Sequence, residues 1–361
     1  MLKKNSINYL LLFSIIVISL FGLLMIYSSS SIWAMYKFND PFKYVKNQGL
    51  FFIIGMVMMY FVSKINYHFY QINSNKIFLT AIILLILVLI PGVGTVRNGS
   101  RSWFGIGSFG VQPSEFMKIA MIIFVSKYLS KNNYSLKNNV LPILLVLLVV
   151  FGLIMLQPDF GTGTIIVMTV IGLLFVYGVS MKLFVKFAFL GLIGVVGLII
   201  AAPYRLTRIL SFLNPWSDPL GSGFQIIQSL YAIGPGGILG FGLFNSRQKH
   251  FYLPEPQTDF IFSIITEELG FLGALIVISL FVVIIFNSLK TARNTNDLFG
   301  KYLAFGISFQ IAFQTILNLM VVTGLIPVTG VTLPFLSYGG SSLLITLLEF
   351  SIILNISRYQ K

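Results

Sequence analysis

Residues 81–90 read AIILLILVLI, an unbroken run of ten apolar side chains. A strand of a membrane β-barrel would alternate polar with apolar residues, and this run does not alternate. A helix satisfies all of its backbone hydrogen bonds internally, as the interior of a bilayer requires. Because a span takes about 20 predominantly apolar residues, we predict a transmembrane helix near residues 77–91.

The composition of the whole chain extends this conclusion beyond one segment. Hydrophobic residues make up 57% of the 361 residues, and charged residues make up only 9%. The mean hydropathy is +0.91, and a soluble globular protein carries roughly 25% charged residues. The chain has too few polar residues to cover a water-soluble fold, so we predict an integral membrane protein.

The net charge of +14 would suggest a nucleic-acid partner in a soluble protein. Here the basic residues are spread over the loops, where membrane topology and anionic lipid account for them, and no nucleic acid is expected. Cysteine is absent, which excludes disulfides and thiolate metal sites.

Ten stretches are apolar enough to serve as spans. Two of them share the uncharged run Tyr302 to Leu348, which Pro and Gly residues interrupt. We predict a single polytopic domain over 1–361, an all-α integral membrane protein with about ten transmembrane helices. A large extracytoplasmic loop, about 203–259, is expected between helices 7 and 8, with short helices inside it. The spans are expected near 8–28, 45–63, 77–91, 112–129, 139–157, 161–179, 184–202, 260–287, 302–325 and 338–356.

The orientation follows from the positive-inside rule. Of the 24 Lys and Arg residues, 14 fall in segments that are inside if the N-terminus is inside, 9 fall outside, and Lys118 lies within a span. Both termini are then cytoplasmic. Six of the ten acids fall at or near the outer face: Asp40, Glu115, Asp159, Asp218, Glu255 and Asp259.

Ionisable residues inside spans are costly and are candidates for function. Glu115 and Lys118 have i, i+3 spacing, so they share a helix face. They form either a structural ion pair or the lining of a polar cavity. Glu267 and Glu268 point about 100° apart on a helix, so at most one of them is expected to face such a cavity. Glu349 has the weakest case and is interpreted as a packing contact.

Asp259 lies in the stretch PEPQTDFIF, residues 254–262, at the start of the eighth predicted span. A carboxylate in the first turn of a helix is favoured by the helix dipole. One interpretation is a helix N-cap shared with Thr258. The other is a catalytic carboxylate where the membrane meets water.

Several cations of the outer loops are candidates for an anionic lipid headgroup such as a pyrophosphate, because the planar fork of Arg suits phosphate oxygens. Interfacial anchoring is the alternative for each of them. The glycines of GPGGILGFG lack the strand–helix context of a dinucleotide site, so no organic cofactor is expected. The candidate headgroup contacts are Arg101, Arg205, Arg208, Arg247 and Lys249.

Long segments of the chain resemble the SEDS family of FtsW, RodA and SpoVE, and within it FtsW and SpoVE more than RodA. The resemblance is carried by stretches such as LQPDFGTGTIIV at 156–167, SRQKHFYLPEPQTDFIFSIITEELGFLG at 246–273 and VVTGLIPVTGVTLPFLSYGGSS at 321–342. It covers the chain nearly end to end.

The resemblance implies a peptidoglycan glycosyltransferase of the bacterial cytoplasmic membrane, serving cell division or sporulation. Such a protein polymerises lipid II into glycan strands at the outer face and releases undecaprenyl diphosphate. Its implied partners are a class B penicillin-binding protein and other divisome or sporulation proteins. Asp259 corresponds to the essential aspartate of the family, and Glu115 and Lys118 correspond to residues that line a central cavity. Glu267 is a further candidate for the cavity.

Two roles remain open for Asp259. It could act as a general base toward the attacking sugar hydroxyl, or it could hold a divalent cation, Mg²⁺ or Mn²⁺, at the pyrophosphate. A lipid II flippase and a divisome scaffold without catalysis are the alternative functions. The outer position of most acids argues against a flippase, because a path through the membrane should be polar along its whole depth.

Overall fold

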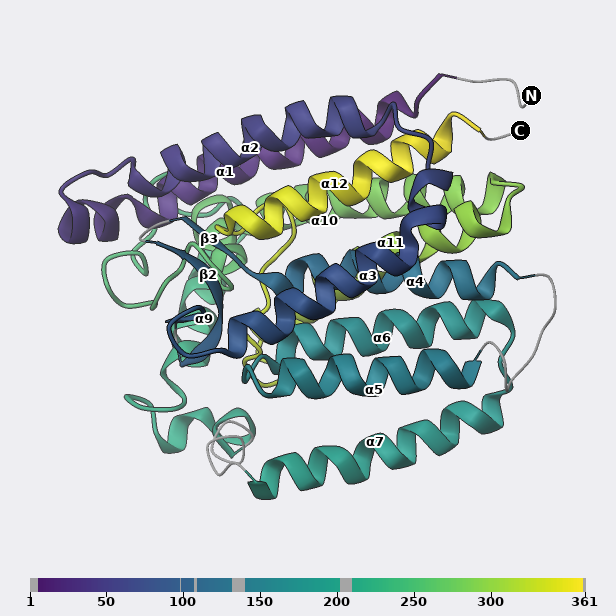
Figure 1. The fold of residues 1–361 in the computed structure, drawn as a ribbon. Helices are drawn as coiled ribbons and strands as arrows, with labels where there is room; N and C mark the ends of the chain where they lie inside the picture. The colour runs from purple at the N-terminus through teal and green to yellow at the C-terminus, as the bar shows by residue number, and fades with distance from the viewer. Residues whose placement is uncertain (1–5, 98, 107–108, 132–139, 202–209, 360–361) are drawn as a thin grey trace.

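The computed structural model describes residues 6–97, 99–106, 109–131, 140–201 and 210–359. Ten long helices lie side by side in it (Figure 1), and each overlaps one of the ten predicted spans. The predicted all-α membrane fold is therefore confirmed. The helices are α1 Tyr9–Phe38, α2 Lys43–Val62, α3 His68–Leu89, α4 Pro113–Leu129, α5 Leu141–Met155, α6 Phe160–Tyr177, α7 Met181–Ala201, α10 Ile261–Asn294, α11 Leu298–Val322 and α12 Gly340–Ser357.

Seven of these helices are long and apolar enough to cross a membrane within the described residues, and α5 is a shorter apolar helix. The predicted spans at 8–28 and 77–91 are too short. Helix α3 begins at His68 and not near residue 77, and α1 continues beyond residue 28 through a run of serines to Phe38. Serine is able to stay in an apolar helix when its hydroxyl bonds to a carbonyl of the preceding turn. The Ser30 hydroxyl donates such a bond to Ile26 O at 2.6 Å.

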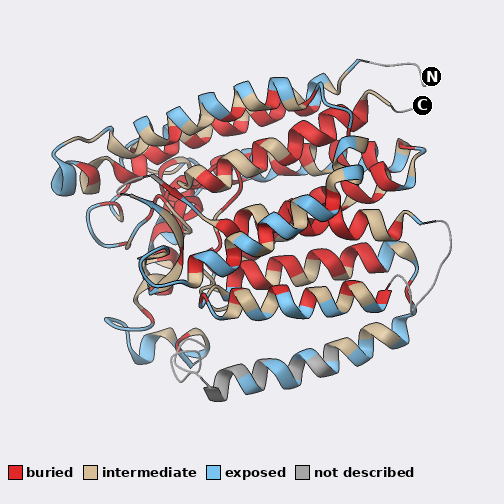
Figure 2. Cartoon of the chain, viewed as in Figure 1, coloured by how far each residue is buried: buried red, intermediate tan, exposed pale blue. Residues whose placement is uncertain are grey.

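The packing places the charged helix α4 in the middle of the bundle. Helix α4 contacts α3, α6 and α11, and α12 contacts α2 and α11. Figure 2 shows the buried residues on the faces that the helices turn toward one another. The two termini lie at the same end of the bundle, called here the terminal end, where Asn8 N donates to Ser357 Oγ at 3.1 Å (Figure 1).

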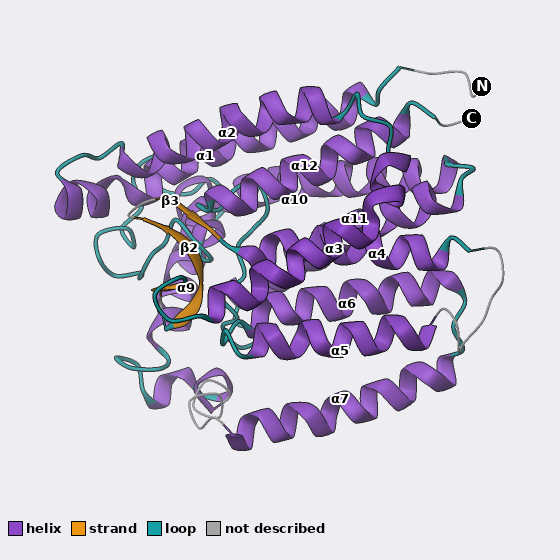
Figure 3. Cartoon of the chain, in the orientation of Figure 1, coloured by secondary structure: helices purple, strands orange, loops and turns teal. Residues whose placement is uncertain are grey.

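The opposite end, called here the loop end, carries a small antiparallel sheet that was not predicted from the sequence (Figure 3). Its strands are β1 Thr95–Arg97, β2 Ser100–Ile106 and β3 Phe109–Val111. Arg97 pairs with Ser100 across the first hairpin, and Gly99 in the turn has φ +79°. The Asn-Gly pair at 98–99 is a strong hairpin signal.

The long loop before α10 contains the short helices that were expected there. The helix α9 covers Phe224–Ile233, and the 3₁₀ turns η2 Pro215–Ser217 and η3 Gly234–Gly236 lie on either side of it. The segment after η3 folds back against α10, where Phe241 N donates to Glu267 O at 3.0 Å.

The eighth predicted span is wrong in one respect, because α10 is two helices joined at a sharp kink. Gly270 has φ 62° and ψ −159° within it, a backbone conformation that is essentially restricted to glycine. Residues 261–269 form a short buried helix, and residues 271–294 form the long one. The backbone groups freed at the kink bond to the preceding loop, and Phe271 N donates to Gly237 O at 2.9 Å.

Candidate active site at the loop end

Asp259 lies just before the short first helix of α10. The N-cap position of α10 is occupied by Phe260, which makes no side-chain capping bond. The interpretation of Asp259 as the N-cap residue is therefore wrong. Asp259 is half-buried, and the Thr258 hydroxyl donates to its Oδ1 at 3.0 Å.

One helix and one loop, both far from Asp259 in sequence, support the backbone of the segment around it. Asn318 on α11 donates from Nδ2 to Asp259 O at 2.8 Å and to Val331 O at 2.7 Å. Tyr338 N donates to Gln257 O at 2.8 Å. The segment that carries Asp259 is thus joined at two points to α11 and to the 323–339 loop before α12.

Glu115 and Lys118 form the ion pair that their spacing predicted. Lys118 Nζ lies 2.9 Å from Glu115 Oε2, and the two residues are only 2% and 6% exposed. Lys118 Nζ also donates to Gln314 Oε1 on α11 at 3.0 Å. A buried cation held by two partners is compatible with both proposed roles, the structural pair and the cavity group.

Asp159 also belongs to this polar region, although it was not among the predicted site residues. It caps α6 by accepting from Thr162 N at 3.1 Å, and it accepts from Gln112 Nε2 at 2.9 Å. Burial raises the pKa of the Asp159 carboxyl, and the hydrogen bonds from Thr162 oppose the rise. The sequence signal was an aspartate directly before a helical run, the position that favours an N-cap.

Glu349, which was interpreted as a packing contact, makes a buried polar contact between two helices. It is fully buried in α12, and its Oε1 accepts from Gln310 Nε2 on α11 at 2.9 Å. The buried carboxylates of the bundle therefore include Glu349 as well as Glu115.

Glu267 and Glu268 both anchor the loop at 244–249. Glu267 accepts from the Ser246 hydroxyl and from Arg247 N at 2.8 Å. Glu268 accepts from Phe244 N at 3.0 Å and from the Ser28 hydroxyl of α1 at 2.6 Å. Both carboxylates are buried, and these contacts give each of them a structural task. The expected place of Glu267 in a substrate cavity finds no support in its contacts.

The predicted headgroup cations are placed differently from one another. Lys249 is buried, and its Nζ donates to Glu268 Oε1 at 3.2 Å. Its ammonium therefore lies in the interior of the loop, paired with Glu268, and the expectation that Lys249 contacts a headgroup is corrected. Arg247 is exposed, with its guanidinium 4.6 Å from the centre of the Phe241 ring. Arg101 is half-buried on β2.

The two remaining headgroup candidates, Arg205 and Arg208, lie outside the described residues. Their predicted contact with a headgroup stays a prediction.

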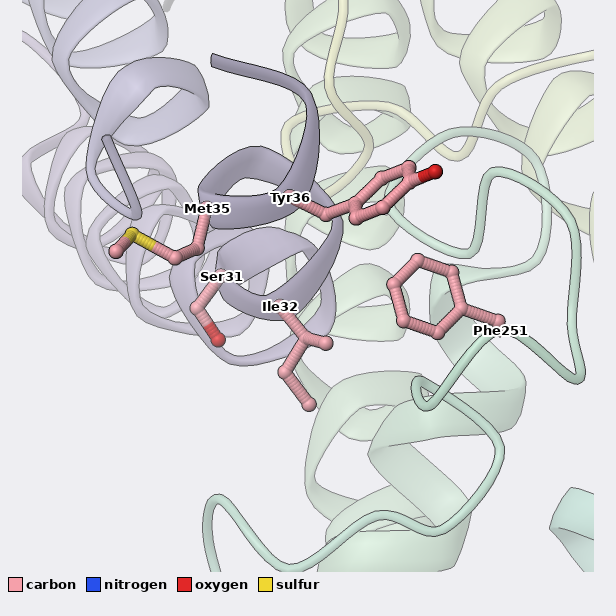
Figure 4. A pocket seen from close by; sticks show the side chains of 5 residues that line it. All are labelled: Ser31, Ile32, Met35, Tyr36 and Phe251. Carbon is pink, nitrogen blue, oxygen red and sulfur yellow. The ribbon is translucent and has the colours of Figure 1, made fainter. Parts of the chain in front are cut away.

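Two open cavities lie beside the 244–252 loop. One of about 600 Å³ is lined by polar residues that include Arg247 and His250. The other, of about 440 Å³, lies between the loop-end part of α1 and Phe251 (Figure 4). Ile32, Met35 and Tyr36 of α1 line it, so it is mostly apolar. Asp259 and Lys118 do not line either of them.

Among the described residues, no three His, Asp or Glu side chains are grouped so that they could hold a metal ion. Mg²⁺ is commonly held by one or two carboxylates together with substrate phosphates and water. A single carboxylate such as Asp259 would match that pattern only if a diphosphate and water supplied the remaining ligands.

Long apolar helices around a buried ion pair, with a half-buried carboxylate among ordered loops at one end, define a polytopic membrane protein with a polar site at one face. A family model described as "Cell cycle protein", covering FtsW, RodA and SpoVE, matches residues 8–361. The chain belongs to this family. The family assignment from the sequence is therefore confirmed.

Curated relatives match over almost the whole chain. Stage V sporulation protein E of Bacillus subtilis is 52% identical, with 99% of each chain covered. A probable peptidoglycan glycosyltransferase FtsW of Geobacter sp. strain M18 is 38% identical, with 99% of this chain and 98% of the relative covered. A relative with the same name from Coxiella burnetii is 40% identical, with 99% of this chain and 99% of the relative covered.

Solved structures agree with the fold. A chain from a structure titled "Structural coordination of polymerization and crosslinking by a peptidoglycan synthase complex" superposes with a TM-score of 0.80 at 29% identity, covering 98% of both chains. The rod shape determining protein RodA of Thermus thermophilus superposes with a TM-score of 0.73 at 26% identity, covering 99% of both.

Proposed function

We propose that this protein is a peptidoglycan glycosyltransferase that polymerises lipid II at the outer face of the bacterial cytoplasmic membrane. Relatives that match nearly end to end at 38–40% identity carry the name of that activity. The observation in the structure that supports it most directly is the placement of Asp259. Its carboxylate is half-buried at the loop end, and α11 links its backbone to the buried Lys118.

The reaction joins two sugars. A hydroxyl of one attacks the anomeric carbon of the other, the new glycosidic C–O bond forms, and the bond to the lipid diphosphate breaks. As a general base, Asp259 would accept the proton of the attacking hydroxyl. A divalent cation held by Asp259 would neutralise charge on the departing diphosphate. The exposed guanidinium of Arg247, on the loop, would donate hydrogen bonds to the same negatively charged diphosphate.

We further propose that the loop end faces the cell exterior and that both termini are cytoplasmic. The distribution of Lys and Arg along the sequence supports this orientation. The structural neighbour that is part of a peptidoglycan synthase complex supports a class B penicillin-binding protein as partner. The 52% identity to a sporulation protein supports a role in sporulation, alongside the division role suggested by the FtsW relatives.

The test is lipid II polymerisation by the purified protein with its class B partner. Asp259→Ala is expected to lower the rate by about 10²–10⁴-fold, the usual contribution of general acid–base catalysis. Asp218→Ala is a matched control, because Asp218 is an exposed aspartate of the same long loop that accepts from Ser222 N at 2.8 Å. A folded Asp259→Ala protein that polymerises at the wild-type rate would remove Asp259 from the mechanism.

A further inference from the structure

Three amide side chains follow one side of α11. Gln310, Gln314 and Asn318 are spaced four residues apart, which corresponds to a rise of about 6 Å from one to the next. All three are almost completely buried. Each of them bonds to a different polar part of the protein, so the amides connect groups that the chain brings together only by folding.

Asn318 holds the backbone of Asp259. Its Nδ2 donates to Asp259 O at 2.8 Å and to Val331 O at 2.7 Å, which uses both hydrogens of the amide. The two carbonyls belong to separate loop segments, one before α10 and one before α12. Asn318 is 0% exposed, so water cannot easily replace it if it is removed.

Gln314, one turn further into the bundle, holds Lys118. Its Oε1 accepts from Lys118 Nζ at 3.0 Å, and its Nε2 donates to Thr332 O at 2.9 Å. Val331 and Thr332 are adjacent, so the two amides donate hydrogen bonds to consecutive carbonyls of one segment. This segment also lies against the start of α6, where a Cβ on Gly161 would be 2.8 Å from Thr329 O.

We propose that Asn318 and Gln314 are positioning residues that set Asp259 and Lys118 relative to each other in the polymerisation reaction. The proposal rests on the proposed function. Neither amide needs to touch the substrate, because each acts through the group that it holds. Their common attachment to Val331 and Thr332 fixes the height of both groups along α11, roughly one helical turn apart.

The kinetic test compares Asn318→Ala with Asn355→Ala. Asn355 is a matched control, since it is also 0% exposed and also holds a loop, through Ser63 O at 2.8 Å and Tyr67 N at 3.0 Å. It lies at the terminal end, away from Asp259. Both variants should lose similar thermal stability. Because a shift of about 1 Å in a reacting group can cost 10²-fold, only Asn318→Ala should lower kcat, by about 100-fold.

The KM for lipid II should change less than about threefold in Asn318→Ala, because the substrate contacts remain. Gln314→Met, which keeps the side-chain length but removes both hydrogen bonds, should likewise lower kcat. If kcat falls in parallel with stability in Asn318→Ala and Asn355→Ala alike, or is kept in Asn318→Ala, the positioning role is refuted. If Asn318→Ala does not fold, Asn318→Ser retains one donor and takes its place in each comparison.

A second measurement does not depend on catalysis. The chain has no cysteine, so Asp259→Cys provides a single thiol for a nitroxide spin label. The label should become more mobile by electron paramagnetic resonance when Asn318→Ala is added, and should not change when Asn355→Ala is added. Equal spectra in the two backgrounds would overturn the proposal. If the wild-type protein makes no glycan beside an active control synthase, the proposed function fails, and the spectra still decide whether Asn318 positions residue 259.

Discussion

Replacing Lys118 with methionine tests what the buried ion pair contributes. Lys118→Met keeps much of the side-chain volume but removes the ammonium that lies 2.9 Å from Glu115 Oε2. Glu115 is 6% exposed, so its carboxylate would be left buried without a cation. Breaking a buried pair in this way typically costs about 3–5 kcal/mol. For a chain of this size, that corresponds to a fall in the unfolding midpoint of roughly 4–8 °C.

The double variant Glu115→Gln/Lys118→Met separates structure from activity. It has no unpaired charge at the pair, so most of the lost stability should return, because neutral replacement of a buried pair is often close to neutral in free energy. If Lys118 also serves the reaction, the double variant should remain unable to polymerise lipid II. If the pair is only structural, stability and polymerisation should recover together.

The intrinsic fluorescence of the three tryptophans can follow unfolding in detergent, and lipid II polymerisation can be measured on the same preparations. The reasoning would be refuted if Lys118→Met unfolded within about 1 °C of the wild type. It would also be refuted if the double variant were as unstable as Lys118→Met alone, since the loss would then not arise from an uncompensated carboxylate.

Two further predictions concern the parts that support the site. Gly270→Ala should reduce the yield of folded protein sharply, because Gly270 has a positive φ and a Cβ there would be 2.4 Å from Gly240 N. Gly152→Ala is the control, because a Cβ at Gly152 meets nothing within 4 Å. Equal yields of the two variants would contradict the kink. Glu268→Gln should make the 244–249 loop more sensitive to proteolysis, because it leaves the buried Lys249 ammonium without its carboxylate. Adding Lys249→Met should restore resistance to the protease. An unchanged digestion rate in Glu268→Gln would show that the ion pair does not hold the loop.

The spans were predictable because runs of apolar residues encode them, and Pro and Gly residues divide the one uncharged run, Tyr302 to Leu348, that holds two of them. The pairing of Glu115 with Lys118 was also predictable from local sequence, because i, i+3 spacing places the two side chains on the same face of a helix. The kink at Gly270 was not predictable, because it depends on a segment about 30 residues earlier in the chain that bonds to the freed backbone groups. A Gly within an apolar run carries no local sign of such a partner.

The amides of α11 were missed for a different reason. Gln314 and Asn318 are uncharged, so a search for ionisable residues within spans does not select them. Their importance appears only when their partners are known, and those partners lie on α4 and on two loops. The burial of Lys249 was equally hidden, because the sequence shows a basic residue in an outer loop and does not show which way it points.

The two chain ends and the loop end are separated by the length of the bundle. Helix α1 alone has 30 residues and is about 45 Å long, and near its loop end Trp33 and Tyr36 contact Phe251. A fluorescent protein fused to either terminus would therefore leave the region around Asp259 unobstructed. A partner confined to the termini would act on the reacting groups only through tilts or shifts of the helices.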